Sequence, residues 1–395
     1  GTPACTGPSQ SFTITVNPSP AVSFSPTNQT ICSGDTSALV TLSSTTSGAT
    51  FAWTAIQTDA SGASSGTGTT IAQALTSPGS FIGSVDYTIT PTLNSCVGLP
   101  VHSIITVNPT PVAVATPAAT TICSGSATNI PLTSLVTGAT FAWTVVQNNV
   151  SGASTGNGTS IVQTLTATSA NPGSAIYTIT PTANGCVGVP ITVTINVTPV
   201  PTSTITYAGT PFCTSLTTGQ VVTLTGTSAY TGGTYSSTTG LAIDATTGAI
   251  TPSTSTPGNY VVTYTVPASA GCSSVPTTTN VIVNVPVTAT ILYSGSPYCS
   301  GVTNASVTLT GATGGTFTAS TGLIINPTTG AVDLSSPAGS YTVTYTIAAA
   351  GGCSAVVVTT PITINLSSVP VTGFSYTTPV CKNGTNPVAI PSTGF

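Results

Sequence analysis

The sequence predicts an all-β protein made of tandem immunoglobulin-like β-sandwich domains, with one disulfide each, arranged as an elongated rod. Cysteines recur at a nearly fixed interval, and apolar and hydroxyl side chains alternate at strand period. The 31 Pro and 40 Gly leave no window with helical periodicity and caps. About seven short strands in roughly 80 to 90 residues is the size of one immunoglobulin-like sandwich.

The cysteines form two alternating sets that define a repeat. The early set is Cys32, Cys123, Cys213, Cys299 and Cys381, and the late set is Cys5, Cys96, Cys186, Cys272 and Cys353. Neighbours within a set are 81 to 91 residues apart, so one interval corresponds to one small domain. Because the chain lacks CxxC pairs and nearby His ligands, the pattern favours disulfides over zinc. Disulfides in turn predict a secreted, extracellular or cell-surface location.

The same register predicts which cysteines pair. Joining each early cysteine to the next late one gives Cys32–Cys96, Cys123–Cys186, Cys213–Cys272 and Cys299–Cys353, each pinning one pole of its domain. Cys5 and Cys381 remain as halves of incomplete repeats, unpaired within the chain or paired outside it. Each bridge would close a loop of about 55 to 65 residues, worth roughly 4 kcal/mol in the chain-entropy treatment.

The predicted domains follow from these positions. Residues 1–19 are the C-terminal part of an incomplete repeat, residues 20–108, 109–198, 199–286 and 287–369 are complete repeats, and residues 370–395 are the N-terminal part of another. Alternating segments at 13–18, 105–109, 193–199 and 362–365 are predicted strands that close successive domains. Short Pro-containing connectors at 17–20, 108–111, 198–201 and 284–286 should restrict tumbling between neighbours, which favours a semi-rigid rod.

The repeats belong to two subtypes. Repeats 20–108 and 109–198 carry Gly-Ala-Thr-Phe-Ala-Trp-Thr, followed by Gly-rich segments at 61–68 and 151–158. Repeats 199–286 and 287–369 lack Trp and carry Gly-Leu-x-Ile-Asp/Asn-x-x-Thr-Gly-Ala-Ile/Val. The first pair resembles PKD-like repeats and the second resembles cadherin-like or immunoglobulin-like repeats of giant secreted surface proteins of Bacteroidota. This resemblance covers the four complete repeats and implies an adhesin or stalk of the type IX secretion substrate class.

The composition excludes several classes of function. The chain has one Lys, no Arg, no Glu, one His and five Asp, with a formal net charge of −4. General acid–base catalysis needs titratable groups with tuned pKa values, and nucleic-acid binding needs a basic patch. A run of 18 apolar residues, which could insert into a membrane, is also missing. We therefore expect no enzyme activity, no cofactor, no metal site, no nucleic-acid partner and no direct membrane insertion.

For several residues a functional role is conceivable, but the sequence favours a structural role. Trp53 and Trp143 could stack on a sugar, but a Trp at this strand position predicts a core aromatic residue. The Gly-rich segments lack the Lys of a phosphate-binding loop. Asp244 and Asp333 suggest calcium by analogy with cadherins, yet calcium takes six to eight oxygen ligands, so turn residues are expected. His102 is predicted to be a strand or surface residue.

The sequence thus predicts a structural extracellular protein, a repeat array that forms part of a cell-surface fibre, filament or adhesin stalk. Its expected partners are copies of itself or further repeats of the same longer chain. An alternative is an adhesin module that binds surface glycans, which an exposed aromatic cluster would favour. A third interpretation is a passive spacer of a large secreted enzyme.

Overall fold

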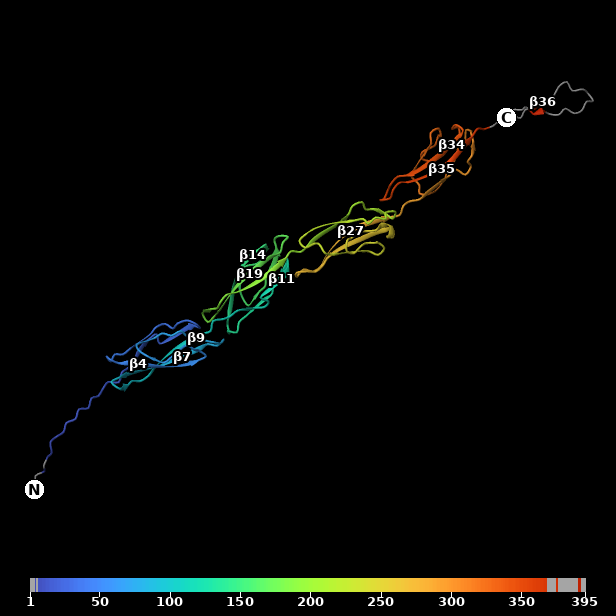
Figure 1. Cartoon of the computed structure of the whole chain (residues 1–395). Coiled ribbons are helices and arrows are strands. Elements are labelled where there is room, and N and C mark those ends of the chain that lie inside the picture. The colour runs from blue at the N-terminus through green and yellow to red at the C-terminus, as the bar shows by residue number, and fades with distance from the viewer. Residues whose placement is uncertain (1–3, 5, 368–373, 376–389, 392–395) are drawn as a thin grey trace, which may run out of the picture. The chain divides into compact units, whose positions relative to one another are not determined.

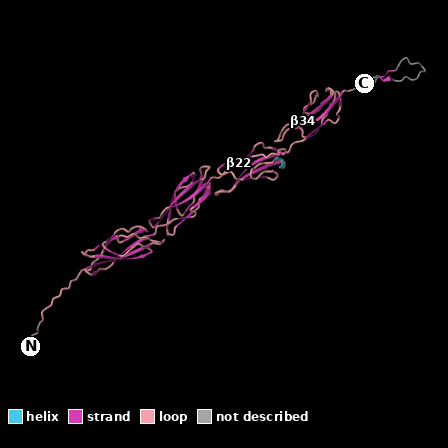
Figure 2. Cartoon of the chain, in the orientation of Figure 1, coloured by secondary structure: helices cyan, strands magenta, loops and turns pink. Residues whose placement is uncertain are grey.

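The computed structural model describes residues 4, 6–367, 374–375 and 390–391. In this part of the chain the regular elements are strands, apart from one 3-10 turn, η1 (Pro252–Thr254) (Figure 2). The strands form four β-sandwiches in chain order, which we call sandwich 1 (residues 23–108), sandwich 2 (114–198), sandwich 3 (202–284) and sandwich 4 (289–365) (Figure 1). The predicted all-β fold of tandem sandwiches is therefore confirmed.

Sandwich 1 consists of two sheets whose apolar faces form one core. The first sheet has the order β1 (Ser23–Ser25), β3 (Val40–Ser43), β6 (Thr70–Ile71). The second has the order β2 (Asn28–Cys32), β9 (Val101–Asn108), β7 (Gly83–Leu93), β4 (Thr50–Thr58), β5 (Gly66–Thr67), with β8 (Cys96–Val97) beside β7. Burial alternates along β7, so that Val85, Tyr87 and Ile89 face the core with no exposed surface.

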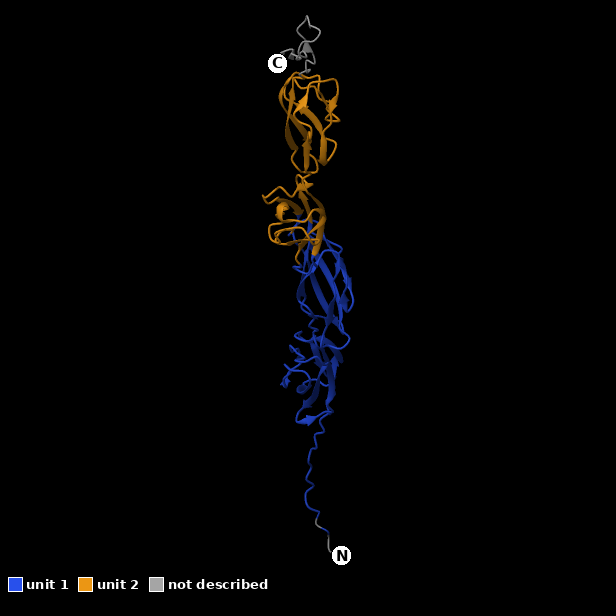
Figure 3. Cartoon of the chain, turned by 90° about the vertical axis from the view of Figure 1, so that its right-hand side faces the viewer, with its two compact units in different colours: residues 1–202, 227–229, 268–274 blue, residues 203–226, 230–267, 275–395 orange. Residues whose placement is uncertain are grey.

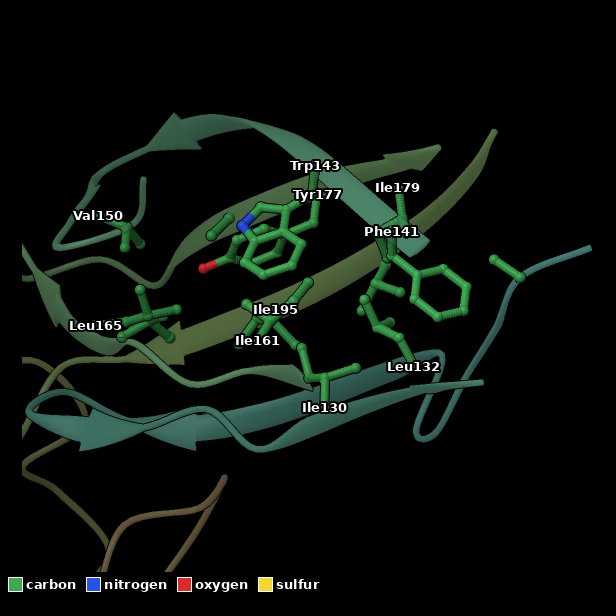
Figure 4. Packing of buried hydrophobic residues seen from close by; sticks show 14 residues of the cluster. Ile130, Leu132, Phe141, Trp143, Val150, Ile161, Leu165, Tyr177, Ile179 and Ile195 are labelled. Atoms are coloured by element: carbon green, nitrogen blue, oxygen red, sulfur yellow. The ribbon is translucent and has the colours of Figure 1, made fainter. Parts of the chain in front are cut away.

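Sandwich 2 repeats this arrangement. One sheet is β10 (Val114–Ala115), β13 (Ile130–Thr133), β17 (Ser160–Ile161); the other is β11 (Ala119–Cys123), β21 (Ile191–Thr198), β19 (Gly173–Ala183), β14 (Thr140–Asn148), β16 (Gly156–Asn157), with β20 (Cys186–Val187) beside β19. A third small sheet is β12 (Ser126–Ala127), β18 (Thr164–Ala167), β15 (Val150–Ser151). Figure 4 shows the side chains of Trp143, Tyr177 and Ile195 packed between the two layers of strands.

Sandwiches 3 and 4 have fewer strands. In sandwich 3, β22 (Thr202–Tyr207) pairs with β24 (Val222–Thr227), opposite β23 (Phe212–Cys213), β27 (Val275–Asn284), β26 (Gly258–Val266), β25 (Thr234–Ser237). In sandwich 4, β28 (Ala289–Leu292) pairs with β31 (Thr308–Gly311), and β30 (Asn304–Ala305) with β33 (Val332–Asp333), opposite β29 (Tyr298–Cys299), β35 (Val356–Asn365), β34 (Gly339–Ile347), β32 (Thr316–Ala319). Further along the chain, β36 (Phe374–Ser375) pairs with β37 (Ile390–Pro391).

One predicted strand is wrong. Residues 13–18 have the alternating pattern but form no strand, and Phe12, Ile14 and Val16 are exposed. The described residues offer this segment no neighbouring strand, and an unpaired strand does not persist because its backbone ladder and apolar face are unsatisfied. The same pattern at 105–109 becomes part of β9 because β7 and β2 flank it.

The edge strand that carries each early cysteine runs parallel to the last strand of its sandwich. In sandwich 1, β2 is parallel to β9, and Cys32 lies opposite Asn108. The same pairing places Cys123 opposite Thr198, Cys213 opposite Asn284 and Cys299 opposite Asn365. Each early cysteine therefore lies beside the point where the chain leaves its sandwich.

The chain divides into two compact units (Figure 3). The first comprises residues 1–202, 227–229 and 268–274, and the second comprises residues 203–226, 230–267 and 275–395. Sandwiches 1 and 2 belong to the first unit. Residues 268–274, the turn that carries the late cysteine of sandwich 3, group with the first unit because Cys272 is bonded to Cys123 of sandwich 2.

Candidate functional site: disulfide junctions between successive sandwiches

Among the described residues, three disulfides link the four sandwiches, one between each sandwich and the next along the chain. The pairs are Cys32–Cys186, Cys123–Cys272 and Cys213–Cys353, with Cα–Cα distances of 5.6, 4.7 and 4.9 Å. These distances lie in the range of ordinary disulfides. An early cysteine is thus bonded to the late cysteine of the following repeat, and we call each such contact a junction.

This pairing contradicts the predicted pairs Cys32–Cys96, Cys123–Cys186, Cys213–Cys272 and Cys299–Cys353, and with them the expectation of one disulfide inside each domain. The early cysteine lies at the end of the last strand, whereas the late cysteine precedes the start of that strand. In sandwich 1 the seven residue steps of β9 separate the two ends by about 23 Å. Two cysteines can be bridged only when their Cα atoms are within about 7 Å, so Cys32 cannot reach Cys96.

Cys96 and Cys299, both predicted to be disulfide-bonded, are free thiols in the described part of the chain. Cys96 is half-buried and Cys299 is exposed. Cys5 and Cys381, predicted to be unpaired within the chain or paired outside it, lie outside the described residues.

The junction between sandwiches 1 and 2 has a polar contact beside the disulfide. Asn108, at the end of β9, donates a hydrogen bond from its side-chain amide to the backbone oxygen of Asn184, with an N–O distance of 2.9 Å. The backbone N–H of Ser33 donates to the oxygen of Asn108 at 2.8 Å. Asn108 is only 6% exposed and Cys186 is 1% exposed, whereas Cys32 is half-buried, so the amide and the Cys186 side of the bridge are shielded from solvent.

The junction between sandwiches 3 and 4 is built in the same way. The side-chain amide of Asn284 donates to the backbone oxygen of Gly351 at 2.9 Å, and Thr214 N–H donates to Asn284 oxygen at 2.8 Å. At the remaining junction Thr198 stands in place of Asn, and Ser124 N–H donates to its oxygen at 2.8 Å. Asn or Thr therefore closes each sandwich directly opposite the early cysteine.

The late cysteine sits after a tight turn whose two residues have positive φ. Before Cys186 these are Asn184 (φ 48°) and Gly185 (φ 78°), and before Cys353 they are Gly351 and Gly352. A Cβ on Gly352 would lie 1.8 Å from the backbone oxygen of Pro211. Glycine is thus needed there both for its φ and for the close approach of the preceding sandwich.

Trp53 and Trp143, predicted to be core aromatic residues, are each 7% exposed and belong to the cores of sandwiches 1 and 2. The indole N–H of Trp53 donates to the backbone oxygen of Ser64 at 3.2 Å, and Trp143 makes the same bond to Ser154. The Gly-rich segments therefore fold over the indoles as covering loops.

Sequence reasoning missed a glutamine that holds each of these loops. The Gln73 side chain accepts hydrogen bonds from the Tyr87 hydroxyl at 2.7 Å and from Ser64 N–H at 2.9 Å, and it donates to Ser64. Gln163 does the same with Tyr177 and Ser154 in sandwich 2. The recurrence of Gln at the same place in both repeats was the available signal.

Asp244 and Asp333 lie in turns of sandwiches 3 and 4. The Asp244 carboxylate accepts hydrogen bonds from the N–H groups of Thr247 at 2.7 Å and Thr246 at 2.9 Å, which lower its pKa. Asn326 accepts the equivalent two bonds in sandwich 4, so the position does not require a charge. Hydrogen bonding from Ser335 N–H likewise lowers the pKa of Asp333.

His102 lies on the exposed face of β9, with its ring Nδ1 3.0 Å from an oxygen of Asp86. Within the described residues no group of three or more His, Cys, Asp or Glu side chains could hold a metal ion. No helix among those residues is long and apolar enough to cross a membrane. Nothing in this part of the chain points to enzymatic activity.

The fold and the junctions define a tandem array of immunoglobulin- or cadherin-like sandwiches. Residues 29–111 and 120–201 match the PKD-like domain family. These two matches cover most of sandwiches 1 and 2. No curated protein sequence matches this chain.

The solved structures to which the chain is similar include the following three. Mouse cadherin-23 EC22–24 is 14% identical, with a TM-score of 0.34 over 68% of this chain and 99% of that one. The human desmocollin-1 ectodomain is 14% identical, with a TM-score of 0.26 over 89% of this chain and 80% of that one. Sidekick-1 immunoglobulin domains 1–5 are 13% identical, with a TM-score of 0.28 over 88% and 81%.

Proposed function

We propose that the chain is a structural segment of an extracellular repeat array, part of a cell-surface fibre, filament or stalk. The observation that carries this proposal is that each of the three disulfides joins two successive sandwiches. A bridge inside a domain stabilises only that domain, whereas a bridge between domains resists their separation. The proposed domain limits are the repeat boundaries stated above, and the proposed partners are copies of the chain or further repeats.

Disulfide chemistry supports the extracellular location. Disulfides persist in oxidising compartments and are rare where cellular reductants keep thiols reduced. The bonded cysteines are 140 to 154 residues apart, which corresponds to about 5 kcal/mol of unfolded-state constraint per bridge in the chain-entropy treatment. That contribution would be lost in a reducing cytosol, so the array suits an oxidising environment.

The junctions also support a semi-rigid rod. A disulfide and short Pro-containing connectors together limit how two neighbouring sandwiches can rotate. If each sandwich extends about 40 Å, the four in line should reach about 160 Å. A compact globule of this length would have a radius of gyration of only about 21 Å. Small-angle scattering of the 395-residue protein should give a maximum dimension of about 160 Å or more and a radius of gyration well above about 21 Å. A radius of gyration near that of the compact globule would reject the rod.

Labelling of intact cells tests the proposed location and role. An antibody raised against the folded array should bind unpermeabilised cells of the producing organism, and immunogold electron microscopy should place the label along filaments or stalks. A control antibody against a cytosolic protein should label only permeabilised cells. Label that required permeabilisation, or that lay diffusely on the envelope without extended structures, would contradict the proposed role.

A further inference from the structure

The C-terminal end of sandwich 4 repeats the elements that form a junction elsewhere. Cys299 lies opposite Asn365, just as Cys32 lies opposite Asn108 and Cys213 opposite Asn284. Ser300 N–H donates to Asn365 oxygen at 2.7 Å, the bond that each junction has at this place. In the other sandwiches the early cysteine is bonded and the Asn amide, where present, donates to a late turn.

At sandwich 4 both groups are without a partner among the described residues. Cys299 is an exposed free thiol, and no described residue accepts a hydrogen bond from the Asn365 amide, which is exposed. The equivalent Asn108 is 6% exposed because the next sandwich covers it. The free thiol and the exposed amide together match one half of the junctions that are occupied elsewhere in the described chain.

The N-terminal end of sandwich 1 presents the complementary half. Asn94 (φ 46°) and Ser95 (φ 65°) form the turn before Cys96, and both have positive φ, as Asn184 (φ 48°) and Gly185 (φ 78°) have before Cys186. Cys96 is a free thiol, and no described side chain donates to the backbone oxygen of Asn94. Ser95 replaces a glycine, and at the equivalent Gly185 a Cβ would meet nothing within 4 Å. A junction like that between sandwiches 1 and 2 therefore has room for the Ser95 side chain, whereas one like that between sandwiches 3 and 4 does not, because a Cβ at Gly352 would lie 1.8 Å from the backbone oxygen of Pro211.

We propose that Cys96 and Cys299 are complementary junction cysteines, each of which forms a disulfide with a further sandwich of this repeat class. Cys299 forms its disulfide with a late cysteine that follows a turn of two residues with positive φ. Cys96 forms its disulfide with an early cysteine that lies opposite the Asn or Thr at the end of a sandwich's last strand. Two early cysteines do not pair because such a pair would lack the turn, and two late cysteines do not pair because such a pair would lack the strand end that Asn or Thr closes. A second copy of this chain carries both halves and is the probe used below.

The bond forms by thiol–disulfide exchange with oxidised glutathione. The thiolate of one cysteine displaces one glutathione thiolate to give a mixed disulfide, and the thiolate of the second cysteine then displaces the other. The two cysteines together lose two electrons and two protons, and one oxidised glutathione becomes two reduced molecules. The junction geometry decides which cysteine resolves the mixed disulfide.

The test uses two variants of the whole chain, both with Cys5→Ser and Cys381→Ser so that no other unassigned thiol remains. One carries Cys96→Ser and keeps Cys299, and the other carries Cys299→Ser and keeps Cys96. Each is incubated alone, and both are mixed in equal amounts, in a glutathione buffer. Products are separated without reductant, and their disulfides are mapped by mass spectrometry after peptic digestion, because the chain has one tryptic site, Lys382.

We expect a heterodimer linked through Cys299 and Cys96 in the mixture, and monomers in each separate incubation. Adding Asn365→Ala to the variant that keeps Cys299 should slow heterodimer formation several-fold and leave its alkylation by iodoacetamide unchanged. Homodimers as abundant as heterodimers, or a mixture without cross-links, would overturn the proposal. This experiment probes junction chemistry in solution, whereas cell labelling probes location, so the two proposals can fail separately.

Discussion

Gly66 and Trp53 show how closely single residues are matched in sandwich 1. An ideal Cβ at Gly66 would lie 2.6 Å from Cζ2 of Trp53, and at Gly156 the corresponding distance to Trp143 is 2.8 Å. The backbone at neither glycine has positive φ, so the requirement is for space rather than for backbone freedom. The covering loop can approach the indole only because this position has no side chain.

We therefore expect Gly66→Ala to destabilise sandwich 1 by about 1 to 3 kcal/mol, the usual cost of overpacking a core. Its calorimetric transition should move down by at least about 4 °C. Gly156→Ala should act alike in sandwich 2. Gly79→Ala is the matched control, because its nearest contact would be 3.9 Å away. Equal transitions for Gly66→Ala and Gly79→Ala would mean that the indole moves aside without cost.

At the scale of elements, the pairing of β2 with β9 determines the connectivity of the whole array. Alternation of apolar and hydroxyl residues predicts the strand at 105–109, which is part of β9, but it makes no prediction for the segment of β2. The same alternation is compatible with parallel and antiparallel edges, however, and only the parallel edge carries Cys32 to the far end of its sandwich. The direction of an edge strand is therefore what sequence reasoning lacked.

The regular spacing of the cysteines could not resolve this ambiguity. When both sets recur at nearly the same interval, pairing within a repeat and pairing with the next repeat are equally compatible with the spacing. The Asn that closes β9 was visible in the sequence, but its contact with the turn at Asn184 depends on packing between two domains. Such contacts are long-range and leave no local pattern.

Removing one junction tests the observed connectivity. Cys32→Ser together with Cys186→Ser should lower the melting temperature of sandwiches 1 and 2, because about 5 kcal/mol of unfolded-state constraint is lost across a separation of 154 residues. Cys96→Ser removes only a free thiol and should leave melting unchanged. A non-reducing peptide map of the wild-type protein should show Cys32 joined to Cys186. A peptide joining Cys32 to Cys96 would instead support bridges within domains.

For the whole molecule, the scarcity of ionisable groups predicts an unusual pH profile. Burial raises the pKa values of Tyr87, Tyr177 and Tyr293 to about 12, and it also raises that of Tyr207. The folded state thus keeps these protons where the unfolded state would release them. Stability from this source is complete below the unfolded value near 10 and falls as pH rises toward 12. Alkali, rather than acid, should unfold the array.

On the acid side the signs are opposite and the effects small. The lowered pKa values of Asp244 and Asp333 give stability that is present above the ordinary aspartate pKa of 3.8 and declines as pH falls below it. Both carboxylates are exposed to solvent, which screens their contribution.

We expect melting temperature to vary by less than about 10 °C from pH 3 to pH 9 and to fall steeply above about pH 10. Calorimetry on a variant with Cys5→Ser, Cys96→Ser, Cys299→Ser and Cys381→Ser avoids exchange by unassigned thiols in alkali. Asp244→Asn, which reproduces the residue at position 326, should remove part of the acid-side slope and lower neutral stability by no more than that small contribution. A larger fall in melting temperature on acidification would mean that the few carboxylates contribute more to stability than expected.

The bridges between sandwiches have a topological consequence for damage. The intervals 32–186, 123–272 and 213–353 overlap, so every peptide bond from Cys32 to Cys353 is spanned by at least one disulfide. A single backbone cut anywhere in that stretch leaves both fragments covalently attached. If each disulfide lay within one domain, hydrolysis of a single peptide bond in any connector would separate the chain into two pieces. The overlapping disulfides therefore keep the array in one covalent piece after any single backbone cut between Cys32 and Cys353.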